Sequence, residues 1–200
     1  MKKIILIGGG GHAVSCIEVI ESIKSFEIIG IICTKVKKNI HPYKIIGEDK
    51  DLNKIKKNYK FAINCVGQIK SPEKRIKIYK KLKKLRFILP KIISSTAYVS
   101  KKSTIEEGSI IMNFAFINAN VKIGKNSIIN TRATIEHDVR IGSHCHISTG
   151  VIVNGGTSIG DGTFIGSGTI INENISIGKN CIIKSNSRIN KNLESNTILK

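Results

Sequence analysis

The stretch IGKNSIINTRATIEHDVRIGSHCHI, residues 123–147, places an isoleucine at every sixth position. The same frame runs from residue 99 to residue 189 without an insertion, and it holds 14 isoleucines and 2 valines. A period of six fits no α-helix, because 3.6 residues per turn would scatter these side chains around the helix. It is typical of a parallel β-helix, in which short strands stack and bury their apolar residues against the next coil.

The N-terminal part of the chain has a different pattern. Apolar runs that predict strands alternate with segments of helical spacing. The strands are expected at 3–7, 27–33 and 60–66, and the helices at 13–23, 50–57 and 72–84. This alternation is typical of a small α/β domain with a parallel sheet. We therefore expect a Rossmann-like α/β domain over residues 1–90 and an all-β parallel β-helix over residues 91–200.

The charge is strongly positive, with a net charge of +19, and is densest in KRIKIYKKLKKLR, residues 74–86. That segment predicts an amphipathic helix with its lysines in water. Aromatic residues do not alternate with the lysines as a base-stacking surface requires, so we expect no nucleic-acid partner. No apolar run reaches the ~18 residues of a membrane span. Five cysteines without C-x-x-C spacing favour reduced thiols, and we expect a cytoplasmic protein that binds no membrane.

A glycine loop, GGGGH at residues 8–12, joins the first predicted strand to the first predicted helix. Glycine permits a tight turn and lets backbone N–H groups approach a phosphate at the helix N-terminus. Gly8, Gly10 and Ala13 satisfy G-x-G-x-x-A, but the second strand ends without the acidic residue that would bind a ribose of NAD. His12 stands beside the loop and can donate to a phosphate oxygen. A plain strand-to-helix turn is the alternative.

Three of the five histidines cluster at residues 137–146. None occupies the inward isoleucine position, so we expect their side chains to face outward or towards a neighbouring subunit. His137 lies between Glu136 and Asp138, and a carboxylate beside an imidazole raises its basicity and fixes its tautomer. Such a pair suits a general base. Cys145 falls at a position where small buried residues recur, which favours packing over nucleophilic catalysis.

The hexads resemble those of the hexapeptide-repeat acyltransferases. GGGGH ahead of an α/β unit, followed by EHD in the repeats, closely resembles one subfamily. It comprises the nucleotide-sugar N-acetyltransferases and the sialic acid O-acetyltransferases. The resemblance implies a left-handed β-helix of roughly five coils and a homotrimer with active sites between subunits. It also implies acetyl-CoA as co-substrate, no metal, and a nucleotide-linked 4-amino-4,6-dideoxy sugar as acceptor.

The resemblance further assigns roles to individual residues. It makes His137 the general base and Asp138 the residue that orients it, with direct transfer and no covalent intermediate. Contacts with the sugar nucleotide would come from Gly10, Gly11, His12, Gly67 and Asn130. Contacts with acetyl-CoA would come from His146 and Gly155, the latter one coil above His137, where its missing side chain would admit the pantetheine arm.

Other functions stay open on the sequence alone. Uridine-specific relatives tend to carry paired aspartates where this chain has Cys33 and Thr34, so the nucleotide base is undetermined. O-acetylation of sialic acid or a related nonulosonate would use the same His–Asp pair. A metal enzyme like the γ-class carbonic anhydrases would need different histidine spacing, and a non-catalytic solenoid would leave EHD without a task.

Overall fold

The computed structural model describes residues 1–34 and 42–199. The N-terminal part is a four-stranded parallel sheet with the order β3-β2-β1-β4. The strands are β1 Lys2–Ile7, β2 Phe26–Ile32, β3 Ile45–Gly47 and β4 Phe61–Asn64, and the helices are α1 Gly11–Ser22, η1 Asp49–Asp51, α2 Leu52–Lys56 and α3 Glu73–Lys84. Each predicted strand and helix of this part is present, and β3 is a short addition.

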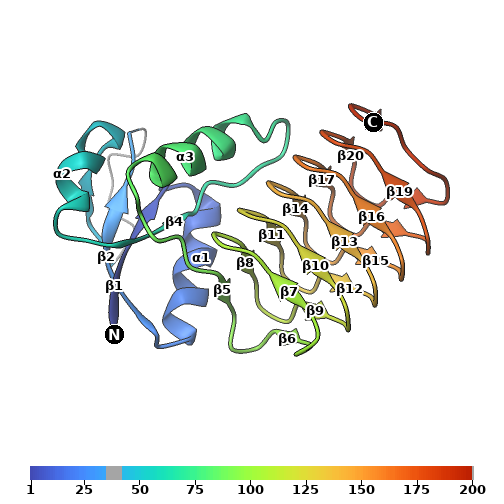
Figure 1. The fold of residues 1–200 in the computed structure, drawn as a ribbon, viewed down its shortest axis with the longest axis horizontal. Helices are drawn as coiled ribbons and strands as arrows, with labels where there is room; N and C mark the ends of the chain where they lie inside the picture. The colour runs from blue at the N-terminus through green and yellow to red at the C-terminus, as the bar shows by residue number, and fades with distance from the viewer. Residues whose placement is uncertain (35–41, 200) are drawn as a thin grey trace.

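The two faces of this sheet bury alternate side chains of each strand. Ile4 and Leu6 of β1 pack with α1, whereas Ile5 and Ile7 pack with α2 and α3. Figure 1 shows α3 above the sheet and α1 between the sheet and the second part of the molecule. The cluster around α1 also includes Ile110, so the α/β part packs against the outer side of the first coils of the repeats, whose own core is separate.

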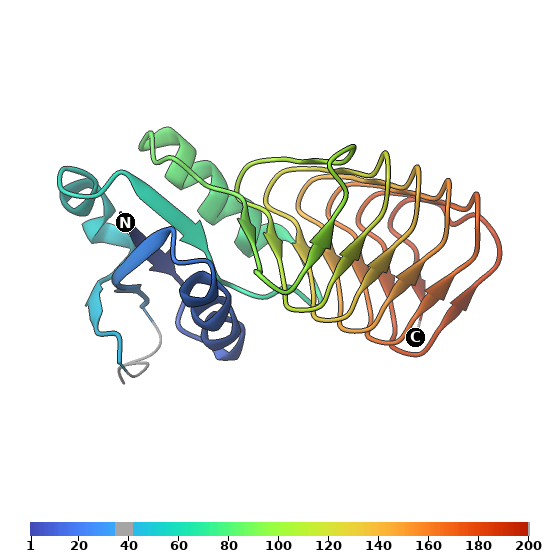
Figure 2. The same cartoon turned by 90° about the horizontal axis from the view of Figure 1, so that it is seen from below.

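The repeats form a parallel β-helix, as predicted, and the coils lie side by side in Figures 1 and 2. Its two-residue strands make three parallel sheets, which we name faces I, II and III. Face I holds β5 Ile92–Ile93, β8 Ile110–Ile111, β11 Ile128–Ile129, β14 His146–Ile147, β17 Phe164–Ile165, β20 Ile182–Ile183 and β22 Ile198–Leu199. Face II holds β6 Tyr98–Val99, β9 Phe116–Ile117, β12 Thr134–Ile135, β15 Ile152–Val153, β18 Ile170–Ile171 and β21 Arg188–Ile189. Face III holds β7 Thr104–Ile105, β10 Lys122–Ile123, β13 Arg140–Ile141, β16 Ser158–Ile159 and β19 Ser176–Ile177.

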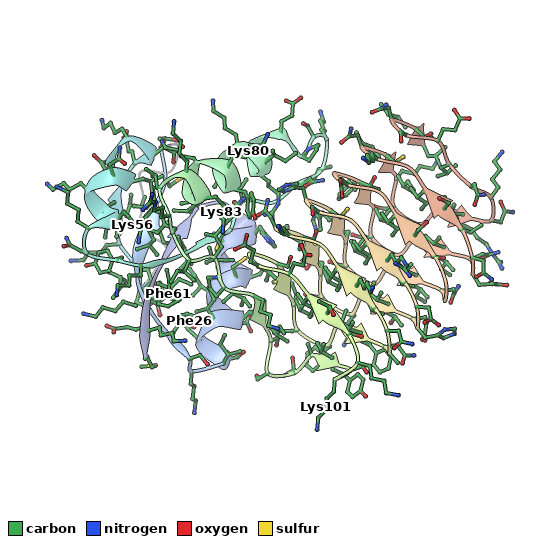
Figure 3. The ribbon with its side chains drawn as sticks, viewed as in Figure 1. Phe26, Lys56, Phe61, Lys80, Lys83 and Lys101 are labelled. Atoms are coloured by element: carbon green, nitrogen blue, oxygen red, sulfur yellow. The ribbon has the colours of Figure 1, made fainter. Side chains whose placement is uncertain are left out.

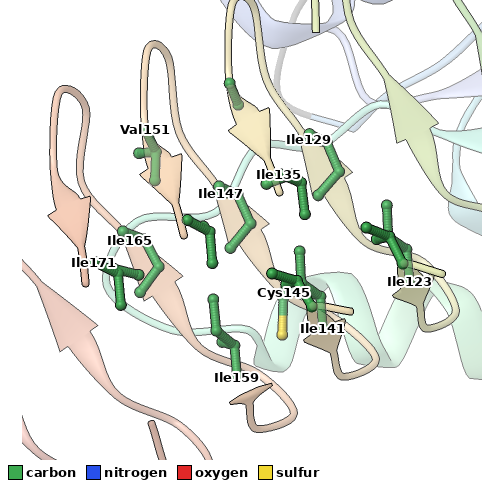
Figure 4. Close-up of a cluster of buried hydrophobic side chains, with 14 of the residues drawn as sticks. Ile123, Ile129, Ile135, Ile141, Cys145, Ile147, Val151, Ile159, Ile165 and Ile171 are labelled. Atoms are coloured by element: carbon green, nitrogen blue, oxygen red, sulfur yellow. The ribbon is translucent and has the colours of Figure 1, made fainter. Parts of the chain in front are cut away.

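The second residue of each strand points inward, which accounts for the period of six. Ile123 pairs with Ile141 and Ile129 with Ile147, so equivalent residues of successive coils are 18 apart and stack. Figure 4 shows these side chains converging inside the coils. The apolar column they form is the core of the β-helix.

The number of coils is slightly larger than expected. The apolar frame begins one hexad earlier, at Ile93, and the seven strands of face I mark six coils. The last coil is short, because β22 pairs with β20 at a spacing of 16 residues (198 minus 182). Leu193 forms a bridge to Ile177 and packs with Leu199 against the core, so this narrower coil covers the end of the apolar column.

The turns between faces have a left-handed residue at a fixed place. Asn120, Asn126, Asn174 and Asn180 have φ between 54° and 61°, and glycine takes the same place in other coils. Asparagine and glycine accept this conformation most readily. The turns therefore project side chains at the three edges of the β-helix, and the histidines His137 and His144 lie in such turns.

Among the residues that the structure describes, no helix is both long and apolar enough to cross a membrane. Lys80 of α3 is exposed at the outer surface, whereas Lys83, labelled with it in Figure 3, lies 2.8 Å from Glu107 of the β-helix. Arg75 of the same helix differs from both, because its side chain is completely buried.

Candidate functional site

His137 and Asp138 form a hydrogen-bonded pair in the turn between faces II and III. Nδ1 of His137 lies 2.9 Å from Oδ2 of Asp138. A carboxylate only accepts, so Nδ1 carries the proton and Nε2 keeps a free lone pair. The hydrogen bond from His137, with a second one from Asn120 at 3.1 Å, lowers the pKa of Asp138. The carboxylate is therefore ionised at neutral pH and fixes the imidazole tautomer.

Gly155 lies one coil beyond His137, as its spacing of 18 residues predicts. A Cβ at this position would lie 2.6 Å from Cε1 and 2.7 Å from Nε2 of His137. Real Cβ contacts are not this short, so the imidazole itself occupies the space that a side chain would need. The sequence interpretation explained this glycine by an approaching coenzyme, whereas the structure supplies a reason within the chain.

The glycine loop ends β1 and begins α1. Gly8 has a φ of 108°, and a Cβ there would lie 2.6 Å from Cγ2 of Val66, so only glycine fits. Gly10 and Gly11 have open space around them, and the first turn of α1 has no acidic residue and no capping side chain. The N-terminus of α1 is therefore accessible and attracts negative charge.

His12 lies on the first turn of α1 with its Nε2 buried. This nitrogen has no hydrogen-bond partner among the described residues. The backbone of Gly67 lies against the His12 side chain, because a Cβ at Gly67 would be 3.5 Å from Cβ of His12. The glycine loop and the 64–68 turn, which holds the predicted residue Gly67, therefore come together.

His146 points away from the inside of the coils, as expected, but the α/β part of the same chain covers it, so it does not reach solvent or a neighbouring chain. It lies on face I, 7% exposed, with Nδ1 2.6 Å from the carbonyl oxygen of Gln68. Nδ1 therefore donates, and Nε2 accepts from Nδ2 of Asn130 at 3.2 Å. Burial lowers the pKa of His146 to about 4, so the ring is neutral. Its centroid lies 6.2 Å from that of His12.

His144 also points away from the inside of the coils and is partly covered by the α/β part. Its Nδ1 accepts from Nδ2 of Asn126 at 2.9 Å, and its ring packs edge-on against Tyr79. Burial lowers its pKa. Cys145 is fully buried in the core of the β-helix, and burial raises its pKa to about 12. Both residues therefore serve packing, as predicted for Cys145.

The site residues fall into two groups on opposite sides of the β-helix. His137, Asp138 and Gly155 lie at the edge between faces II and III. His12, Gly67 and His146 lie on face I, and Asn130 lies in the turn that follows it. The apolar column separates the groups, because nine residues from His137 to His146 are half of an 18-residue coil. A single chain does not bring the two groups together.

A groove follows face I beyond the α/β part. It has a volume of about 510 Å³, and its lining is mainly apolar, with polar atoms at intervals. His146 lies at one end, and the groove continues past Ser148, Ser167, Lys184 and Ser185. The described residues hold no group of three or more His, Cys, Asp or Glu side chains arranged for a metal ion.

The sequence interpretation missed Arg75, Gln68 and this groove. Arg75 precedes Tyr79 by four residues and Leu82 by seven, so it lies on the apolar stripe of α3, and this spacing was the available signal. Gln68 is 3% exposed and contacts both His146 and the carbonyl oxygen of Gly162. No pattern in the sequence marks it.

Comparisons with known proteins match both parts of the chain. Residues 3–82 match the PglD N-terminal domain, and residues 102–136, 120–155 and 156–191 match the bacterial transferase hexapeptide (six repeats). A comparison with curated proteins gives no match.

Solved structures share the whole architecture. PerB from Caulobacter crescentus, in complex with CoA and GDP-perosamine, has a TM-score of 0.93 and 27% identity over 99% of this chain and 93% of that chain. The acetyltransferase domain of PglB from Neisseria gonorrhoeae FA1090, in complex with acetyl coenzyme A, has a TM-score of 0.93 and 26% identity over 98% and 95%. WeeI from Acinetobacter baumannii AYE, at 21% identity and a TM-score of 0.84 over 99% and 96%, shares the fold.

The repeats, the α/β part and these matches define a hexapeptide-repeat acyltransferase with a left-handed β-helix, which confirms the resemblance and the fold class. Within that class, the chain carries a PglD N-terminal domain ahead of the hexapeptide repeats, and it is similar over almost its whole length to PerB and to the acetyltransferase domain of PglB.

Proposed function

We propose that the protein transfers the acetyl group of acetyl-CoA to the amino group of a nucleotide-linked 4-amino-4,6-dideoxy sugar. The observation that carries this proposal is the His137–Asp138 pair, which leaves one imidazole nitrogen free at an exposed edge. The matches to PerB, bound to CoA and GDP-perosamine, and to PglB, bound to acetyl coenzyme A, support the choice of substrates.

His137 acts as the general base in this proposal. As the sugar amine attacks the thioester carbonyl, Nε2 of His137 accepts the proton that the nitrogen loses. The C–N bond forms, the C–S bond breaks, and the departing thiolate recovers a proton from the imidazolium. Asp138 keeps Nδ1 protonated and stabilises the charged ring. General-base catalysis of this kind contributes roughly 10²–10⁴-fold.

The acceptor half of the site lies in the α/β part, residues 1–90. The N-terminus of α1 at Gly10 and Gly11 suits a diphosphate, because no side chain caps its backbone N–H groups. His12 offers the buried Nε2 that has no partner within the described chain. Gly67 lies beside His12 and, having no side chain, leaves room for the acceptor. Asn130 faces the acceptor half from the β-helix.

The coenzyme half lies on the β-helix, residues 91–200. The groove beyond His146 is mainly apolar and runs past several successive coils, which suits a pantetheine arm. Lys184 in its lining suits an anionic phosphate. Both ring nitrogens of His146 have partners within the chain, so we assign it to shaping the groove and not to proton transfer.

A complete site then combines two chains. The base lies on one edge and the two binding halves on the opposite face, so His137 of one chain must meet face I of another. In a ring of three chains, face I of each chain can lie beside the His137 edge of the next chain. We propose a homotrimer for this reason. Closed rotational symmetry is the usual form of such assemblies.

The test is an assay of thiol release from acetyl-CoA with UDP-, GDP- and dTDP-linked 4-amino sugars, and with CMP-sialic acid and free sialic acid as O-acceptors. We expect turnover with one amino sugar nucleotide. His137→Ala should lower kcat by roughly 10²–10⁴-fold while acetyl-CoA binding, measured by calorimetry, stays near normal. Turnover only with a sialic acid would assign O-acetylation instead. Full activity of His137→Ala would remove the proposed base.

A further inference from the structure

Arg75 is a completely buried guanidinium whose hydrogen-bond partners are all neutral. Its Nη1 donates to the carbonyl oxygens of Asn64 and Val66, and its Nη2 donates to the backbone and side-chain oxygens of Asn126 at 2.7 and 3.1 Å. Its Nε has no partner among the described residues, and no carboxylate of the described chain pairs with it. A hydrogen bond from Cys65, aided by the charge of Arg75, lowers the pKa of the buried Cys16 thiol to about 5, so this thiol answers part of the buried charge. Burying a guanidinium whose hydrogen bonds all go to neutral groups is still costly, so this arrangement needs an explanation beyond packing.

The partners of Arg75 belong to both parts of the chain. Asn64 ends β4 and Val66 follows it by two residues, whereas Asn126 lies in a turn between faces III and I of the β-helix. The amides close the network, because Nδ2 of Asn64 donates to Oδ1 of Asn126 at 3.2 Å and to the carbonyl oxygen of Arg75 at 3.2 Å. The planar, forked guanidinium can reach both sides at once, which a single ammonium cannot.

The segment that Arg75 holds is the 64–68 turn, which borders the acceptor half of the site. Val66 lies against Gly8 of the glycine loop, and Gly67 lies against His12. Gln68 continues the connection, because its carbonyl oxygen accepts from His146 and its amide donates to the carbonyl oxygen of Gly162 at 3.0 Å. The turn is therefore fixed to the β-helix at both ends, with Arg75 at one end.

We infer that Arg75 is a positioning residue, which locks the 64–68 turn to the β-helix and so sets His12 and Gly67 in place for the acceptor. It touches neither substrate in this inference. The kinetic part rests on the proposed function, since it requires an acceptor at the glycine loop. The mechanical part, the locking of the turn, stands on the contacts alone.

The kinetic test compares the Michaelis constants of the two substrates. Arg75→Met should raise the acceptor KM by roughly tenfold or more, because a misplacement of about 1 Å has a large effect on a binding constellation, and should leave the acetyl-CoA KM within about twofold. Arg75→Lys keeps the charge but not the fork, and should behave like Arg75→Met. Lys83→Met is the matched control, since Lys83 of the same helix pairs with Glu107 across the same junction at its exposed surface.

The mechanical test does not depend on turnover. Cys65 belongs to the 64–68 turn and Cys16 of α1 contacts it, and both are fully buried. Cys145 and Cys181 are fully buried inside the β-helix. Arg75→Met should speed the reaction of the first two with a thiol reagent, located by mass spectrometry, and leave the second two protected. Where Arg75→Met does not fold, Asn126→Gly serves, because glycine keeps the left-handed φ of 54° and removes the partner side chain.

The outcomes separate the two claims. A raised acceptor KM together with faster labelling of Cys16 and Cys65 supports the inference. A lowered melting temperature with unchanged acceptor KM and unchanged labelling makes Arg75 merely structural and overturns it, as does wild-type behaviour of Arg75→Lys. If the wild-type protein turns over no acceptor, the proposed function fails, and the labelling comparison alone decides the role of Arg75.

Discussion

Replacement of Gly155 by alanine tests whether His137 must stand where the structure has it. The new Cβ would lie 2.6 Å from Cε1 of His137, whereas ordinary contacts begin at 3.4 Å. The imidazole must therefore shift by about 0.8 Å, the difference of these two distances, or swing away altogether. Gly155 is not among the glycines with positive φ, so its backbone accepts alanine without strain.

The size of the effect follows from the exposure of the ring. The His137 side chain is 63% exposed, so it can move into solvent at a cost to folding stability of about 0.5 kcal/mol or less. Its Nε2, however, leaves the place where it meets the acceptor amine. A misplacement of about 1 Å can cost on the order of 10²-fold in rate. We therefore expect Gly155→Ala to lower kcat by about 100-fold with little change in melting temperature.

The assay is thiol release, run with thermal unfolding on the wild type, Gly155→Ala, His137→Ala and the double variant. If the alanine at position 155 acts only by displacing the imidazole, it should not lower kcat further in the His137→Ala variant. The effects of the two substitutions on kcat are then not additive. Glu173→Ala, at the same turn position 18 residues further along, is the matched control. A kcat for Gly155→Ala within twofold of wild type, or full additivity in the double variant, would refute the reasoning.

Two further predictions concern the other histidines of the site. His12→Ala should raise the acceptor KM on the order of tenfold, because it removes a hydrogen-bond donor from the proposed phosphate-binding end of α1. The acetyl-CoA KM should stay unchanged in the same steady-state assay. An unchanged acceptor KM would mean that the glycine loop is only a strand-to-helix turn. The pKa of His146 falls from 6.5 to about 4 on folding, so the unfolded chain takes up a proton that the folded chain refuses. As the pH is lowered from 7 to 4, the free energy of unfolding should therefore fall by about 3 kcal/mol more in the wild type than in His146→Gln, measured by denaturant unfolding. Parallel curves of unfolding free energy against pH would contradict this prediction.

The repeats could be predicted from the sequence almost residue by residue. Each inward isoleucine is required by the same local rule, since a strand of two residues turns only its second side chain into the coil, and the rule repeats at every hexad. The spacing of 18 between His137 and Gly155 then fixed their stacking. The end of the β-helix could not be predicted in this way, because Leu193 and Leu199 leave the frame of six.

The junction of the two parts lay beyond prediction for a different reason. His146 and His144 occupy outward positions, which water covers in a free β-helix and the α/β part covers here. Whether an outward position is buried depends on a neighbour that lies nearly 80 residues away in the sequence, as Gln68 does from His146. The same holds for Arg75, whose partner Asn126 is separated from it by 51 residues.

The proposed base and the proposed binding residues lie on opposite sides of an isoleucine column. The two groups share no hydrogen bond or ring contact within the described residues. Under the proposed function, substitutions in the glycine loop or around Cys33 and Thr34 would therefore alter which sugar or which nucleotide base is accepted without touching His137 or Asp138. Such a layout would let one edge serve a succession of acceptors, with novelty confined to the part that reads them.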